Sequence, residues 1–219
     1  MVMGTPVPME RVAVLTDTHY WPPSASRERF TRETAAQSER DGLLVHRSPE
    51  ILARVLASLA AFASGGGASA IHLGDAGCGG GGFDQGAAEH ALSLRSYRDL
   101  ESAALPTDWP VHHIPGNHDV HPGKGPGMSG DGLEAWSNAL GPAHRISSAA
   151  AAAGSVVELR PPIYRAIHLG KRWRLLLLDS MDGVDRDLDG HGRVGGAQLG
   201  WLEAQLQAAE RGRLHVILC

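Results

Sequence analysis

Short apolar stretches alternate with helical patterns along the first half of the chain. Three of them run directly into polar residues and a turn, which is typical of buried strands: Val12–Leu15, Ala70–Leu73 and Val111–Ile114. Between these stretches, Ser48–Ala63 and Gln85–Glu101 carry apolar residues at helical spacing. Strand, helix, strand, helix, strand is the order of parallel βαβ units, so this half of the chain predicts an α/β fold.

The first predicted helix has recognisable end signals. Ser48 is suited to cap it, Pro49 and Glu50 suit its first turn, and Gly65 is expected to end it. Its buried stripe is predicted at Ile51, Val55, Leu59 and Phe62, with Leu52, Leu56 and Ala63 alongside. The apolar side of the second helix is predicted at Ala88, Ala91, Leu94, Tyr97 and Leu100.

The second half of the chain has a different pattern. Tyr164–Leu169 and Trp173–Leu178 predict a hairpin, followed by a helix near Gln198–Ala209 and an apolar run at Leu214–Leu218. The apolar face of that helix is predicted at Leu199, Leu202, Leu206 and Ala209. Tyr20–Arg47 has no clean period and is interpreted as an insertion, either a lid over a site or a solvated excursion. Length favours a single domain over residues 1–219.

Composition excludes several classes of protein. The chain has 20 Lys+Arg against 24 Asp+Glu, a net charge of −4, which argues against binding nucleic acid or anionic membranes through bulk charge. No apolar run reaches the ~20 residues that a membrane span requires. Two cysteines, Cys78 and Cys219, are too few for a disulfide framework. No signal peptide pattern precedes the first strand, so a cytoplasmic location is expected.

Candidate metal ligands follow each of the first three predicted strands: Asp17-Thr18-His19, Gly74-Asp75 and Gly116-Asn117-His118-Asp119. Parallel strands would bring these groups to one edge of the sheet. Mixed oxygen and nitrogen donors suit Mn, Fe, Zn or Ni better than Mg or Ca. Asp17 and His19 are two residues apart, so extended backbone would point both side chains the same way.

These residues resemble the calcineurin-like metallophosphoesterases, whose signature is D-x-H, G-D, G-N-H-D/E, a later His and finally G-H-x-H. The resemblance covers the first 119 residues well and implies a two-sheet sandwich flanked by helices. It implies two divalent metal ions, Mn, Fe or Zn, with Asp17 and His19 on the first, Asp75 bridging and Asn117 on the second. His118 would serve as an acid for the leaving group or stabilise the transition state. The implied reaction is phosphoester hydrolysis by a metal-bridging hydroxide.

The later part of the family pattern has no counterpart here. His215 lies inside its apolar run, and Gly190-His191-Gly192 lacks the second histidine because Arg193 stands there. The sequence therefore reads as a piece cut before three histidine ligands, with the second sheet incomplete. Weak metal binding, low activity and uncovered apolar surface are the expected consequences.

The resemblance also orders the candidate functions. The G-N-H-D ending and the Gln198…Trp201-Leu202 helix are closest to the cyclic-nucleotide phosphodiesterase-like branch, whereas Gly74–Gly80 departs from the protein phosphatases. A small-molecule phosphoester is the expected substrate; nuclease, nucleotidase and phospholipid hydrolase activities stay open, and the oligomeric state is not specified. One alternative is a catalytically inert phosphate-ester-binding module with the same fold. A nucleotide-binding α/β domain is disfavoured because no G-x-G-x-x-G or G-K-[ST] follows a strand.

Several nearby polar residues have structural interpretations. Asp119 and His121 are expected to orient neighbours or to face water rather than to bind metal. His72 and His112 are predicted to pack against a helix, and the position of His113 is ambiguous.

Overall fold

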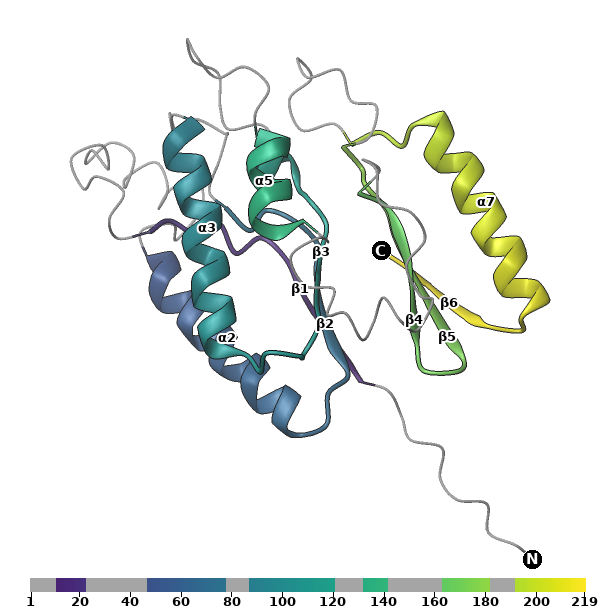
Figure 1. The fold of residues 1–219 in the computed structure, drawn as a ribbon, viewed down its shortest axis with the longest axis horizontal. Coiled ribbons are helices and arrows are strands. Elements are labelled where there is room, and N and C mark those ends of the chain that lie inside the picture. Colours follow the sequence, from purple (N-terminus) through teal and green to yellow (C-terminus); the bar gives the residue numbers. More distant parts are fainter. Residues whose placement is uncertain (1–10, 23–46, 78–86, 121–131, 142–162, 182–191) are drawn as a thin grey trace, which may run out of the picture.

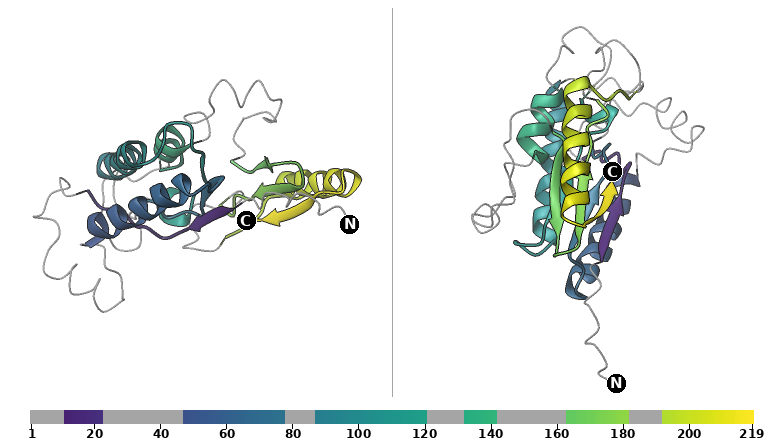
Figure 2. Two further views of the ribbon diagram at one scale, coloured as in Figure 1. Left: turned by 90° about the horizontal axis from the view of Figure 1, so that it is seen from below. Right: turned by 90° about the vertical axis from the view of Figure 1, so that its right-hand side faces the viewer.

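The protein is described from a computed structural model covering residues 11–22, 47–77, 87–120, 132–141, 163–181 and 192–219. Two three-stranded sheets lie face to face, with helices on their outer sides (Figure 1). Helices α2, α3 and α5 cover the first sheet and α7 covers the second, so the layers run helix, sheet, sheet, helix (Figure 2). The α/β sandwich predicted from the sequence is confirmed.

The first sheet consists of the strands that the apolar runs predict. β1 (Val12–Leu15), β2 (Ser69–His72) and β3 (Val111–His113) pair in parallel in that order, each within a residue of the expected bounds. Strand β1 pairs in the register Val12↔Ser69, and β2 in the register Ala70↔Val111. Helices α2 (Ser48–Ser64) and α3 (Ala87–Ala104) lie between the strands in sequence, as parallel connections require.

The second sheet begins with the predicted hairpin. β4 (Arg165–Leu169) pairs antiparallel with β5 (Trp173–Leu177), and the turn between them contains Gly170 at φ 58°. Helix α7 (Gly196–Arg211) then leads to β6 (His215–Leu218), which pairs in parallel with β5. The sheet order is β4-β5-β6.

Two layers of buried side chains hold the sandwich together, and β2 supplies both because its side chains alternate between faces. Ala70 packs on the helix side with a cluster that includes Leu52, Leu56, Leu94, Tyr97 and Trp136. Ile71 packs between the two sheets with Ile114, Leu169, Leu175 and Leu177. Strand β2 is therefore buried on both faces, whereas Val14 of β1 is exposed.

Helix α2 corrects two details of the sequence analysis. Its buried stripe runs through Leu52, Leu56 and Leu59, whereas Ile51 is 39% exposed. The predicted stripe was thus rotated by about one residue. Ser48 is not the cap, since the residue at that position is Arg47; the Ser48 hydroxyl is buried and accepts a hydrogen bond of 2.8 Å from the Trp21 amide. Gly65 follows the last helical residue, as predicted.

Helices α3 and α7 bury polar side chains that an apolar pattern does not detect. In α3, His90, Ser93 and Glu101 are fully buried beside Leu94 and Tyr97, while Leu100 is exposed. In α7, Gln198 and Ala209 are the buried residues, and the predicted contacts Leu199 and Leu206 are exposed. Gln198 is buried because its side chain exchanges two hydrogen bonds with the backbone of Asp179, at 2.8 and 2.9 Å.

Two helices within the described residues were not predicted. α4 (Asn117–Val120) is a single turn after β3, and α5 (Gly132–Leu140) packs on α3 and carries the fully buried Trp136. Of the predicted insertion 20–47, Tyr20 belongs to the core, and residues 23–46 lie outside the described residues. No helix in the described ranges is both long enough and apolar enough to span a bilayer.

Candidate metal centre

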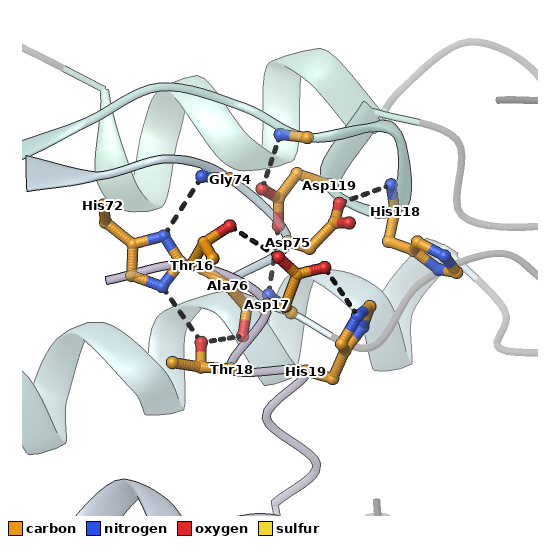
Figure 3. A network of polar contacts seen from close by, with 12 residues as sticks. Thr16, Asp17, Thr18, His19, His72, Gly74, Asp75, Ala76, His118 and Asp119 are labelled. Carbon is orange, nitrogen blue, oxygen red and sulfur yellow. Dashed lines mark hydrogen bonds and ion pairs between the residues drawn. The ribbon is translucent and has the colours of Figure 1, made fainter. Parts of the chain in front are cut away.

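The loops that follow β1, β2 and β3 meet at the carboxyl edge of the first sheet (Figure 3). The first two loops continue the pairing of their strands. Asp17 N–H donates to the Gly74 carbonyl at 3.1 Å, His19 N–H to the Asp75 carbonyl at 3.0 Å, and Tyr20 N–H to Ala76 at 2.9 Å. Backbone hydrogen bonds therefore fix the candidate ligands of the first loop relative to those of the second.

Three of the candidate ligands have left-handed backbone. The φ angles are 54° at Asp17, 41° at His19 and 56° at Asp75. Aspartate and histidine are among the residue types that tolerate this region best after glycine. The prediction that extended backbone points Asp17 and His19 the same way is therefore wrong. The two side chains nevertheless meet, with His19 Nε2 3.6 Å from Asp17 Oδ1, because the chain bends at both residues.

His19, Asp75 and His118 form the core of the site. Each offers one ligand atom, and these atoms all lie within 4.8 Å of one another, with the three residues half-buried. The His19 and His118 rings meet edge to face, with centroids 4.8 Å apart. Metal–ligand bonds are about 2.0–2.2 Å long, so a small inward movement of the side chains would let them share a cation. Two imidazoles and a carboxylate fit Mn, Fe or Zn.

The electrostatics of the site favour neutral imidazole. Burial and then the neighbouring His118 lower the pKa of His19, while the carboxylates of Asp75 and Asp17 act in the opposite direction. Together these effects lower the pKa of His19 below its ordinary value. Neutral imidazole is the form that ligates metals, so His19 is prepared for that role.

Two carboxylates connect the second and third loops. Asp75 Oδ1 accepts the His118 N–H at 2.9 Å. The fully buried Asp119 accepts the amides of Gly77 and Gly116, each at 3.0 Å. Burial raises the pKa of Asp119 to about 7, against the opposing effect of these amide donors. Of the two interpretations of Asp119, orienting its neighbours fits the structure.

Glycine is required where the second and third loops touch. Gly74 has φ +105°, and a Cβ there would lie 2.4 Å from the amide nitrogen of Gly116. A Cβ on Gly116 would lie 2.0 Å from Asp75 Oδ1. These distances are far below van der Waals contact, so any side chain at either position would separate the loops that carry the ligands.

The structure places the other candidates around this core. Asp17 stands beside His19 with its side chain 60% exposed, and Asn117 begins α4 directly before His118. His118 lies among the potential ligands, so its predicted catalytic role and a ligand role are both compatible with its position. His215 is on β6 in the second sheet, near Trp173. His121 and His191 lie outside the described residues.

Histidines of the first sheet form a polar layer that sequence reasoning missed. His72 and His113 are buried, stack at 5.4 Å and approach Tyr97 of α3, which confirms the helix-facing prediction for His72 and resolves it for His113. His113 Nε2 lies 2.9 Å from Glu101 Oε2. His112 is in register with Ile71 and so belongs to the opposite face, contrary to prediction. Strand alternation was the available signal.

Comparison with known proteins supports the architecture. No protein-family model and no curated protein matches the sequence. Among solved structures, a dimetal phosphatase from Danio rerio matches with a TM-score of 0.58 and 15% sequence identity, covering 97% of this chain and 69% of that one. The chain therefore has the fold of a dimetal phosphatase, with His19, Asp75 and His118 gathered where the strands of its first sheet end.

Proposed function

We propose that this protein is a metal-dependent phosphoester hydrolase. The convergence of His19, Asp75 and His118 at the carboxyl edge of a parallel sheet carries the proposal. A fold shared with a dimetal phosphatase adds support, because that protein is described as using two metals. The proposed ligands combine the His19 imidazole with carboxylate and carboxamide oxygens, a mixture suited to divalent Mn, Fe or Zn.

In this proposal two cations bind, with Asp17 and His19 on one, Asp75 shared and Asn117 on the other. When bound, such cations polarise a phosphoryl oxygen and lower the pKa of the attacking water. One oxygen of the Asp75 carboxylate accepts a hydrogen bond of 2.9 Å from the His118 amide, so the second loop also orients the third. His118, next to His19 in the site, is proposed to protonate the leaving oxygen or stabilise the transition state.

The proposed substrate is a small-molecule phosphoester, with a phosphodiester of the cyclic-nucleotide type as the first candidate and the cytoplasm as the proposed location. The sequence motif Gly116-Asn117-His118-Asp119 and the helix containing Gln198 support this branch. Comparing the hydrolysis rates of a diester and a monoester with the same leaving group distinguishes a phosphodiesterase from a phosphomonoesterase.

The test is metal uptake and turnover by the 219-residue chain. Purified protein is loaded with Mn²⁺, Fe²⁺ or Zn²⁺, its metal content is measured, and hydrolysis of bis-p-nitrophenyl phosphate and p-nitrophenyl phosphate is followed. We expect uptake and slow hydrolysis, both lost in Asp75→Asn and His19→Ala. Gly200→Ala is the control, because a Cβ at this position of α7 meets nothing within 4 Å. Uptake without any Asp75-dependent hydrolysis would indicate the inert binding module instead, and absence of uptake would overturn the proposal.

His118 can be tested separately. If His118 is the acid for the leaving group, the variant His118→Asn should retain metal. Its rate should fall more with a phenyl ester than with a p-nitrophenyl ester, since poor leaving groups need protonation most. Loss of metal in this variant would instead make His118 a ligand.

A further inference from the structure

One buried side chain is hydrogen-bonded to both of the first two loops of the site. His72, the last residue of β2, lies beneath them and is fully buried. Its Nε2 is 3.0 Å from the Thr18 hydroxyl in the first loop, and its Nδ1 accepts the Gly74 amide at 3.2 Å in the second (Figure 3). Thr18 and Gly74 directly precede His19 and Asp75 in sequence.

The donors and acceptors around His72 specify one form of the ring. A backbone N–H can only donate, so Nδ1 must carry the lone pair that accepts the Gly74 amide. The proton of the neutral ring is then on Nε2 and is donated to Thr18 Oγ1. The Thr18 hydroxyl in turn donates to the Ala76 carbonyl at 3.2 Å. The chain of bonds is complete, with one proton for each contact.

Aromatic rings surround the His72 ring, and burial keeps it neutral. His113 stacks on one face at 5.4 Å, and the Tyr97 ring meets His72 edge-on at 5.6 Å. Burial, and after it the neighbouring His113, lowers the pKa of His72 to about 3. A cationic ring would also direct an Nδ1–H at the Gly74 N–H, which the geometry does not allow.

We propose that His72 is a positioning residue that holds the loops carrying His19 and Asp75 in register, by bridging the Thr18 hydroxyl and the Gly74 amide. The proposal deepens the proposed function, on which it rests for its effect on metal binding. The bonds of His72 go to the Thr18 hydroxyl and the Gly74 amide, so it acts on His19 and Asp75 through the residues that precede them. The two loops bend at left-handed residues, and the bridge supplements the backbone hydrogen bonds that keep those bends aligned.

Mn²⁺ affinity of the full chain tests this role. Thr18→Val removes the hydroxyl at nearly constant volume, and Thr18→Ser restores it. Bonds that orient metal ligands indirectly typically change metal affinity roughly 10- to 100-fold, so we expect that loss in Thr18→Val and recovery in Thr18→Ser. The control is His113→Gln, which perturbs the neighbouring buried histidine without a bond to either loop. It should lower stability and leave the Mn²⁺ Kd close to that of the unmodified chain.

A second measurement does not depend on metal. Long-range ¹H–¹⁵N NMR of the metal-free chain should show His72 as the neutral Nε2–H tautomer. Amide exchange at Asp17, His19 and Gly74 should be faster in Thr18→Val than in Thr18→Ser.

The two measurements separate the proposals. An Nδ1–H or cationic His72, exchange rates equal in both Thr18 variants, or equal losses of Mn²⁺ affinity in Thr18→Val and His113→Gln would overturn the positioning role. Absence of Mn²⁺ binding by the unmodified chain would overturn the proposed function alone, and the tautomer and exchange rates would still decide the role of His72.

Discussion

Replacing Gly116 by alanine is expected to damage the site and the fold together. The new Cβ would lie 2.0 Å from Asp75 Oδ1 and 2.6 Å from both Asp75 Cγ and the Asp75 amide nitrogen. Asp75 cannot simply withdraw, because the same Oδ1 accepts the His118 amide at 2.9 Å and the Asp75 carbonyl accepts from His19. Either the loops separate or the carboxylate leaves the cluster, and both movements take Asp75 away from His118.

The magnitude follows from two effects. Overpacking of a close-packed site costs about 1–3 kcal/mol. Loss of the buried bond from the His118 amide adds about 1–3 kcal/mol. Because the loops relax in part, we expect the free energy of unfolding to fall by about 2–4 kcal/mol. For a chain of this length that corresponds to a fall in Tm of roughly 5–15 °C.

Urea unfolding followed by circular dichroism, together with Mn²⁺ titration, measures both consequences of Gly116→Ala. Gly200→Ala is the matched control, because the same change inside helix α7 meets nothing within 4 Å. It should raise the free energy of unfolding by about 0.5–1 kcal/mol through helix propensity. If Gly116→Ala kept the stability and Mn²⁺ affinity of the unmodified chain, the reasoning from loop contact would be refuted.

Three further predictions concern the rest of the molecule. Because the pKa of His72 is lowered to about 3 in the folded chain, the unfolded chain binds one more proton between pH 6.5 and 3. As the pH falls through that window, the free energy of unfolding should decrease by up to about 1.4 kcal/mol per pH unit. His72→Gln should flatten this pH dependence, measured by urea unfolding. Glu101→Leu removes the acceptor that faces His113 and should lower the free energy of unfolding by about 1–3 kcal/mol. Glu101→Gln keeps an acceptor oxygen and should lower it less. Equal decreases in the two variants would contradict a hydrogen-bonding role. Leu199 and Leu206 of α7 are 53% and 43% exposed, so replacing both by glutamate should reduce self-association measured by light scattering. The free energy of unfolding should change by only about 0.5 kcal/mol. Unchanged scattering would show that this face of α7 does not associate.

The strands follow from the sequence because short apolar runs that end in turns have few other folded arrangements. Val12–Leu15 is placed to the residue, and the hairpin at β4 and β5 is displaced by one residue at most. Helix faces are less accessible to this reasoning. Glu101 and Gln198 are buried because each finds a hydrogen-bonding partner that is distant in sequence, and hydropathy carries no information about such partners.

The candidate site divides in the same way. The residues at the strand ends were identified from the sequence because the topology brings those ends together. Their grouping depends on loop backbone, which pattern reasoning does not supply. His118 lies within the cluster, and Asp17 and His19 bend at positions that were predicted to be extended. The roles of individual residues as ligands or acid stay predictions.

The bends at Asp17, His19 and Asp75 have a consequence for engineering this protein. Each left-handed residue other than glycine raises the energy of the folded chain by roughly 1 kcal/mol. Glycine at position 17 or 19 would therefore favour the native backbone while removing the donor atoms, whereas at position 75 this gain is offset by loss of the bond from the His118 amide. A selection for thermal tolerance alone would therefore drift toward chains that fold well and coordinate nothing. Libraries designed to raise thermal stability should keep Asp17, His19 and Asp75 unchanged. They should instead vary glycines of α7 such as Gly200, where an added Cβ meets nothing within 4 Å.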